Sequence, residues 1–171
     1  IMAARMPGEG RLTLAPMLNP AGRLVGDFTV AKIGPESFRV NASYGAQDYH
    51  MRLFLDLLPE SGVTVTNVSR DQIGFQLAGP NARKVLEKVT REDVSNEAMP
   101  FRAVQRMNVG LTDALVCRVT YTGDLGYEMY VAPLEQAALY HALAEAGEEF
   151  GMRPFGMRAM MSLRLEKSFG S

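Results

Sequence analysis

Two carboxylates stand where strand-like segments normally place apolar side chains. Asp27 lies in the middle of the β-branched and aromatic run 24–33, and Glu128 lies between Tyr127 and Met129 in a second such run. An ionised group in an apolar environment needs a partner or a function. Antiparallel sheets often keep one face in water, so each carboxylate also fits an ordinary exposed strand position. Residue type and spacing leave both interpretations open.

The other side chains with ligand or ionic chemistry are sparse. Arg164 and Glu166 lie two residues apart in a predicted helix and so point to different sides, which also fits a solvated ion-pair network. His50 and His141 fall on separate predicted helices, and the single Cys117 lies in an apolar run. Neither histidine has a second histidine or cysteine at ligand spacing, so no metal site is predicted.

Composition narrows the class of protein. The 171 residues carry 18 basic and 19 acidic side chains without a run of like charge, so no nucleic-acid partner is predicted. No stretch approaches the roughly 20 apolar residues of a membrane helix, and no secretory leader opens the chain. A single cysteine suits a reducing compartment. We therefore expect a soluble, cytoplasmic protein without a membrane partner, with the mitochondrial matrix as the alternative. The dinucleotide fingerprint, the phosphate loop and the nucleophile elbow are all absent.

The elements that would position the two carboxylates follow from periodicity. Strands are expected at 24–33 and 36–42, joined as a hairpin by Gly34-Pro35, and Ser43 is the expected N-cap of a helix over 44–58. Further strands are expected at 63–68, 73–78, 103–108, 114–121 and 127–131, and helices at 81–89, from 133 onward and at 155–169. A tight hairpin is expected between the last two strands. This order predicts an α+β fold with mainly antiparallel sheets, helices packed on one side and split βαβ (ferredoxin-like) halves.

Four motifs, read together, resemble one family. They are MLNPAGRLVGDFTV at 17–30, QLAGPNA at 76–82, YTGDLGYEMYV at 121–131 and SLRLEK at 162–167. Their order is similar to that of the folate-binding domain of the aminomethyltransferase (glycine cleavage T-protein) superfamily. The segments GRLVGDFTVAK and AMMSLRLEKSF resemble most the C-terminal region of dimethylglycine and sarcosine dehydrogenases. We therefore expect residues 1–171 to form one folate-binding domain, a fragment of a longer chain.

The resemblance implies a reaction and a site. The expected cofactor is tetrahydrofolate, which takes a one-carbon unit from an aminomethyl or iminium donor and becomes 5,10-methylenetetrahydrofolate. Glu128 would hold the pterin by a bidentate pair, Tyr121 and Tyr127 would flank its ring, and Arg164 would also contact the cofactor. Asp27 would be the catalytic residue, as acid/base and electrostatic stabiliser.

The same resemblance implies the partners of this domain. They are folate, a methylated amine that donates the carbon, and the missing flavin and C-terminal barrel domains. FAD is expected only on a missing part of the parent chain. The fragment alone is expected to be inactive.

The departures from the family pattern leave other functions open. Gly26 stands where free T-protein has the first of two aspartates, which leaves only Asp27. Met160-Met161 replaces an Arg-Asp pair, and Arg158 is the candidate to take over the role of that arginine. The alternatives are a stand-alone transferase of the T-protein or sulfonium demethylase type and a non-catalytic folate-binding module.

Overall fold

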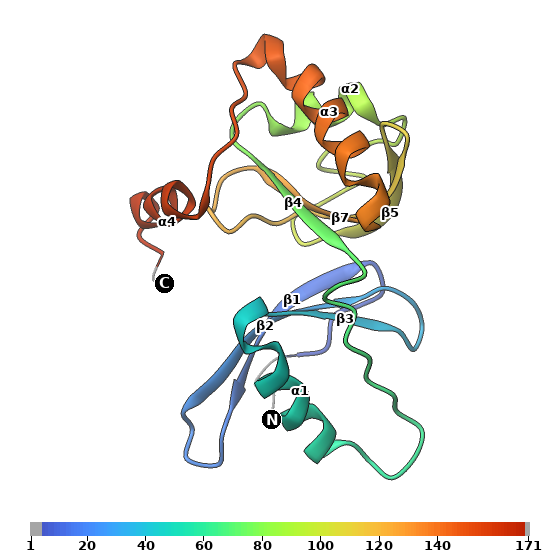
Figure 1. Cartoon of the computed structure of the whole chain (residues 1–171), viewed down its shortest axis with the longest axis vertical. Coiled ribbons are helices and arrows are strands. Elements are labelled where there is room, and N and C mark those ends of the chain that lie inside the picture. Colours follow the sequence, from blue (N-terminus) through green and yellow to red (C-terminus); the bar gives the residue numbers. More distant parts are fainter. Residues whose placement is uncertain (1–4, 170–171) are drawn as a thin grey trace. The chain divides into compact units, whose positions relative to one another are not determined.

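A computed structural model describes residues 5–169 of the chain (Figure 1). Contacts divide the chain into two compact units, Ile1–Gln72 and Ile73–Ser171. Unit 1 is coloured blue to teal in Figure 1, and unit 2 runs from green to red. Within the part that the structure describes, no helix is long and apolar enough to cross a membrane.

Unit 1 is a three-stranded antiparallel sheet with one helix. Its strands are β1 (Arg11–Leu18), β2 (Leu24–Lys32) and β3 (Phe38–Asn41), in the order β1-β2-β3. A short 3-10 turn, η1 (Tyr44–Ala46), leads into α1 (Gln47–Leu57). The predicted hairpin is confirmed, because β2 and β3 pair directly. β1 was not predicted, although it pairs with β2 over its whole length.

The small core of unit 1 lies on one face of this sheet. Alternate residues of β1 and β2 are buried there, and Leu53 and Phe54 of α1 pack against them; the buried set is Ala15, Met17, Phe28 and Val30. Successive strand residues point to opposite faces, so Asp27 lies on the other face from Phe28 and is exposed.

Two predictions for unit 1 need correction. Ser43 precedes η1 rather than α1, and its side chain makes no capping hydrogen bond. The strand predicted at 63–68 is wrong: these residues have no regular secondary structure, and all but Val65 are exposed. Alternating β-branched residues favour an extended chain, but a strand also needs a neighbour for its backbone hydrogen bonds.

Unit 2 is a four-stranded sheet with helices. Its elements are β4 (Ile73–Ala78), α2 (Ala82–Val89), β5 (Val104–Val109), β6 (Thr112–Cys117), β7 (Gly126–Val131), η2 (Pro133–Glu135), α3 (Gln136–Gly147), η3 (Glu148–Phe150) and α4 (Met157–Glu166). The strand order is β4-β7-β6-β5 and every neighbouring pair is antiparallel. The α+β class is confirmed. The helix α2 connects β4 to β5, which lies at the opposite edge of the sheet and runs antiparallel to β4. A split βαβ unit connects two parallel strands, so this connection differs from that of such a unit.

The main core lies between this sheet and the helices α2 and α3. Tyr127, Met129 and Val131 of β7 point into it and are all at most 1% exposed. The helices α2 and α3 lie on this side of the sheet (Figure 1), and their residues Leu86 and Leu139 belong to the same core. Because side chains alternate, Glu128 and Tyr130 lie on the opposite face of the sheet.

The connection between β6 and β7 is longer than predicted. β6 ends at Cys117 and β7 begins at Gly126, so residues 118–125 form a loop instead of a tight hairpin. Gly123 within it has a φ of 78°, a left-handed conformation that favours glycine. This loop carries Tyr121, one of the predicted site residues.

Candidate functional site

Glu128 lies on β7, a central strand of the unit 2 sheet, on the face opposite the helices α2 and α3. Gln76 of β4 is its direct partner across the sheet on one side, and Cys117 of β6 is its partner on the other. The Tyr130 hydroxyl donates a hydrogen bond of 2.8 Å to Glu128 Oε2, and Gln76 Nε2 donates a longer one of 3.5 Å to Oε1. Glu128 is half-buried. A carboxylate on a central strand, fixed by donors from its own sheet, is a preorganised hydrogen-bond acceptor.

Tyr127 and Tyr121 occupy different environments. Tyr127 is fully buried in the core, on the opposite face of β7 from Glu128. Its ring therefore points away from Glu128 and packs in the core. Tyr121 is half-buried in the loop 118–125. The resemblance assigns both tyrosines to the pterin ring, but one lies in the core and the other in a loop.

Arg164 binds Tyr121 in two ways. Its Nη1 donates a hydrogen bond of 2.8 Å to the Tyr121 carbonyl, and its guanidinium lies 4.3 Å from the centre of the Tyr121 ring. A guanidinium over an aromatic face is attracted by the ring quadrupole. Arg164 also lies 5.5 Å from the ring centre of Phe169. The structure therefore brings together two of the predicted cofactor-binding residues from segments far apart in the sequence.

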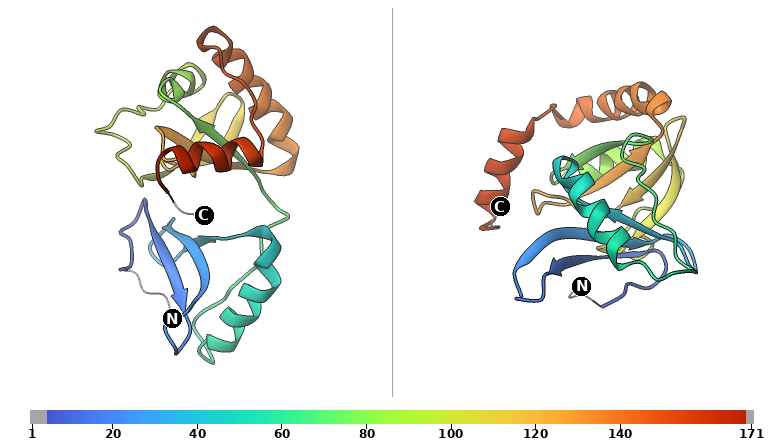
Figure 2. Two further views of the ribbon diagram at one scale, coloured as in Figure 1. Left: turned by 90° about the vertical axis from the view of Figure 1, so that its left-hand side faces the viewer. Right: turned by 60° about the horizontal axis from the view of Figure 1, so that its bottom comes forward.

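The end of α4 is held against the loop by further contacts. Lys167 Nζ lies 2.9 Å from Asp124 Oδ1, and the Phe169 ring lies so close to Gly123 that a Cβ there would meet it at 2.3 Å. None of the residues of α4 is buried. α4 lies apart from the α2–α3 layer, at the end of an extended connection (Figure 2). The last turn of α4 and the residues after it are thus attached to the loop 118–125.

Removing the Asp124 carboxylate is expected to loosen this attachment. The hydrogen bond and charge of Asp124 raise the pKa of Lys167, so the stabilisation is present at neutral pH and is lost as pH rises through that pKa. In Asp124→Asn the Lys167 pKa should fall, and the amides of α4 should exchange with solvent several-fold faster. Hydrogen exchange measured by mass spectrometry tests this, with Asp113→Asn, which removes the exposed Arg106 ion pair, as the control. Equal protection in both variants would contradict the expectation.

Asp27 belongs to unit 1, and the packing around its neighbour Gly26 leaves no room for a second aspartate directly before it. Asp27 is exposed on β2. Gly26 is buried on the other face, where a Cβ would meet the Phe28 ring at 2.5 Å and His50 Nε2 at 3.1 Å. Phe28 is itself 1% exposed, so a side chain at position 26 would require the core of unit 1 to shift. Arg158 is exposed in the first turn of α4.

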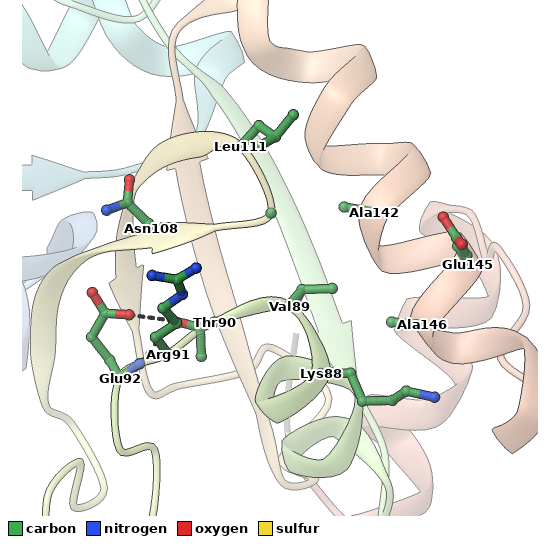
Figure 3. Close-up of a pocket in the computed structure, with 11 residues that line it drawn as sticks. Lys88, Val89, Thr90, Arg91, Glu92, Asn108, Leu111, Ala142, Glu145 and Ala146 are labelled. Atoms are coloured by element: carbon green, nitrogen blue, oxygen red, sulfur yellow. Dashed lines mark hydrogen bonds between the residues drawn. The ribbon is translucent and has the colours of Figure 1, made fainter.

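A groove of about 820 Å³ was not anticipated from the sequence (Figure 3). It runs between the end of α2, the β5–β6 turn and α3, and its lining includes Lys88, Glu92, Leu111 and Glu145. The Thr90 hydroxyl donates a hydrogen bond of 2.6 Å to Glu92, which lowers the pKa of that carboxyl. None of the predicted site residues lines the groove. The residues that line it form no motif, so the sequence carried no signal for it.

The candidate site has no metal-binding character in the described part of the chain. Among residues 5–169, no group of three or more His, Cys, Asp and Glu side chains is placed to hold a metal ion. What the site offers instead is a carboxylate acceptor on Glu128, the amide oxygen of Gln76 as a further acceptor, and the Arg164 guanidinium stacked on the Tyr121 ring. This combination suits a flat, hydrogen-bond-donating ligand with anionic groups.

Comparison with known proteins places this chain in a family. The chain is 35% identical over 99% of its length to the mitochondrial dimethylglycine dehydrogenase of Homo sapiens, of which it spans only 20%. It is 31% identical over 94% of its length to the aminomethyltransferase of Halothermothrix orenii, covering 44% of that protein. A heterotetrameric sarcosine oxidase from Corynebacterium sp. U-96, solved with pyrrole 2-carboxylate, shares the fold with a TM-score of 0.63 at 21% identity, over 87% of this chain and 69% of that one.

The family profile covers the whole chain. The GCVT N-terminal domain matches residues 1–171, which confirms the resemblance carried by the four sequence motifs. The chain spans about one fifth of the length of the dimethylglycine dehydrogenases it matches. It is an aminomethyltransferase-like domain related to dimethylglycine dehydrogenase and to sarcosine oxidase subunit alpha. This chain belongs to the GCVT N-terminal domain family.

Proposed function

We propose that this domain binds tetrahydrofolate and forms 5,10-methylenetetrahydrofolate within a dimethylglycine or sarcosine dehydrogenase-like enzyme. The observation that carries the proposal is Glu128, a half-buried carboxylate fixed by Tyr130 and Gln76 on a central strand of a GCVT domain. The reduced pterin presents an amino group and a ring N–H side by side. Two parallel hydrogen bonds from these donors match the geometry of one carboxylate.

The hydrogen bonds within the protein prepare Glu128 for this role. The bond from Tyr130 to Oε2 orients the group, and each carboxylate oxygen can accept more than one hydrogen bond. Orientation before binding lowers the entropy lost when the ligand binds. Glu128 therefore acts as the pterin anchor.

Tyr121 and Arg164 form a second contact region. The Arg164 guanidinium holds the Tyr121 ring from one face, which fixes the ring as a surface for stacking. Arg164 also supplies a positive charge suited to the carboxylates of the folate tail. Tyr127 has no part in this site, since its ring lies in the core.

Asp27 performs the chemical step in this proposal. The folate amine that attacks the one-carbon donor loses a proton, and Asp27 accepts it. The negative charge of Asp27 also stabilises the cation that develops on the donor. Its exposed position on β2 gives it access to a ligand. The donor is an iminium if a flavin domain with FAD precedes this domain, and an aminomethyl carrier if it does not.

A titration of tetrahydrofolate tests the pterin anchor. In the full-length protein, Glu128→Gln keeps the size of the side chain and removes the charge. Hydrogen bonds to charged groups contribute about 1.5–3 kcal/mol, so the dissociation constant should rise about 10- to 100-fold. Isothermal titration calorimetry under anaerobic conditions measures it, with Glu87→Gln on the exposed side of α2 as the matched control. Equal affinities of Glu128→Gln and the wild type would refute the assignment.

A non-catalytic folate-binding module is the second candidate. It is favoured by Gly26, which leaves this chain with one aspartate where free T-protein has two, and by the packing that fills the space beside Gly26. The two functions differ in whether Asp27 affects turnover. Visible flavin absorption of the purified full-length protein separates the dehydrogenase-like enzyme from a stand-alone transferase of the T-protein or sulfonium demethylase type. For the location of this chain, the cytoplasm stays the prediction, while the human relative is named as mitochondrial.

A further inference from the structure

The Gln76 side chain has a defined orientation beside Glu128. The two residues are direct cross-strand partners on β4 and β7, and their side chains lie on the same face of the sheet. Gln76 Nε2 faces Glu128 Oε1 at 3.5 Å. The reverse orientation would place the amide oxygen against the carboxylate oxygen, where two acceptors repel each other. The amide oxygen of Gln76 must therefore point away from Glu128.

That amide oxygen is buried without a hydrogen-bond partner. Gln76 Oε1 accepts nothing from any residue in 5–169, although it is shielded from solvent. Buried polar atoms in folded proteins are nearly always paired, so an unpaired acceptor requires an explanation. Here the acceptor lies next to a carboxylate that the proposed function assigns to ligand binding. A donor brought by the ligand would satisfy it.

The acceptors match the donors of one class of ligand. A 2-amino-4-oxo pterin has a ring N–H and an adjacent amino group with two hydrogens. Glu128 uses one oxygen for the ring N–H and the other for one amino hydrogen. The second amino hydrogen then has no partner on Glu128. Gln76 Oε1 is the neighbouring acceptor that completes the set.

We propose that Gln76 is a specificity-determining residue that accepts the second hydrogen of the pterin 2-amino group. This rests on the proposed function, because it assumes that Glu128 anchors the pterin. A site with a buried acceptor strongly rejects an analogue that lacks the matching donor, since the acceptor is then left unpaired. Gln76 thus makes the site select 2-amino pterins over analogues in which a methyl group replaces the amino group.

Titration of two ligands into three forms of the protein tests the role of Gln76. Tetrahydrofolate and its 2-desamino-2-methyl analogue are titrated into the full-length wild type, Gln76→Leu and the exposed control Gln136→Leu. The measured quantity is the ratio of the two dissociation constants. We expect this ratio to fall about 5- to 10-fold in Gln76→Leu relative to the wild type and to stay constant in the control. A purely structural role for Gln76 would change both constants together and leave the ratio unchanged.

The outcomes separate this inference from the proposed function. An unchanged ratio in Gln76→Leu, with tetrahydrofolate binding that still depends on Glu128, overturns the role of Gln76 alone. Absence of tetrahydrofolate binding in the wild type, or binding independent of Glu128, overturns both. If Gln76→Leu does not fold, Gln76→Met has a similar length without the acceptor, and the same ratio decides.

Discussion

Replacing Asp27 with asparagine in the full-length protein is expected to lower turnover about 10²- to 10⁴-fold, the range in which positioned acid/base groups act. Asparagine preserves the shape of the side chain but neither accepts the proton nor carries the charge. The dissociation constant for tetrahydrofolate should change little, since Glu128 holds the pterin. Asp27 is exposed, so the substitution should not disturb folding. Single-turnover formation of 5,10-methylenetetrahydrofolate measures the effect.

The control for this experiment is Asp56→Asn. Asp56 is exposed on α1, in the same unit, and has no part in the proposed site. Turnover of this variant should match the wild type. If Asp27→Asn binds tetrahydrofolate and turns over normally, Asp27 is not the catalyst and the non-catalytic module is the better description. Loss of binding in Asp27→Asn would instead assign Asp27 to the folate site itself.

Replacing Gly126 with alanine is expected to destabilise unit 2 by about 3 kcal/mol or more, at the upper end of overpacking effects. A Cβ at Gly126 would lie 2.1 Å from the Leu77 carbonyl oxygen and 2.9 Å from the Ala78 Cα. Both obstacles are backbone atoms of β4, which cannot move without breaking the pairing of β4 with β7. Denaturant unfolding followed by circular dichroism gives the change in free energy of unfolding.

Gly45→Ala separates this steric effect from the general cost of losing a glycine. Gly45 lies in η1, has a negative φ, and a Cβ there would meet nothing within 4 Å. Alanine is also the better helix former, so this variant should be as stable as the wild type or slightly more stable. Wild-type stability of Gly126→Ala would mean that β4 and β7 are further apart than the structure places them.

The helices and strands whose signals lie within a few neighbouring residues were predicted correctly from the sequence. The β2–β3 hairpin formed where a Gly-Pro turn separates two β-branched runs, and α2 began directly after Gly79-Pro80-Asn81. The predicted strand around Glu128 is β7, and its alternation sets the two faces of the sheet. Strict alternation also implies that Tyr127 and Glu128 point in opposite directions. The pattern thus contained the reason why Tyr127 is a core residue.

Elements that depend on distant partners were missed. β1 forms because β2 provides its hydrogen bonds, while the segment 63–68 has the composition of a strand but no assigned strand structure. The two glycines near 121–126 suggested a tight turn. Gly126 instead belongs to β7, where the close approach of β4 requires a residue without a side chain.

The candidate site was predictable only in part. No residue pattern provides a physical reason to place Arg164 near Tyr121, because the contact joins a helix and a loop that are separated in the chain by the whole of α3. The spacing of Gln76 in the sequence was not distinctive either. Its proposed role depends on one amide oxygen, which is buried without a hydrogen-bond partner. Such features depend on side-chain geometry, which a residue pattern does not encode.

The attachment of α4 to the loop has an evolutionary consequence. Arg164 with Tyr121, Lys167 with Asp124, and Phe169 with Gly123 connect two segments that are distant in sequence. A substitution in one segment changes which residues the other can tolerate; a side chain at position 123, for instance, is compatible only with a smaller residue at 169. Selection therefore acts on the two segments together. The residue types at these paired positions should covary among relatives of this chain.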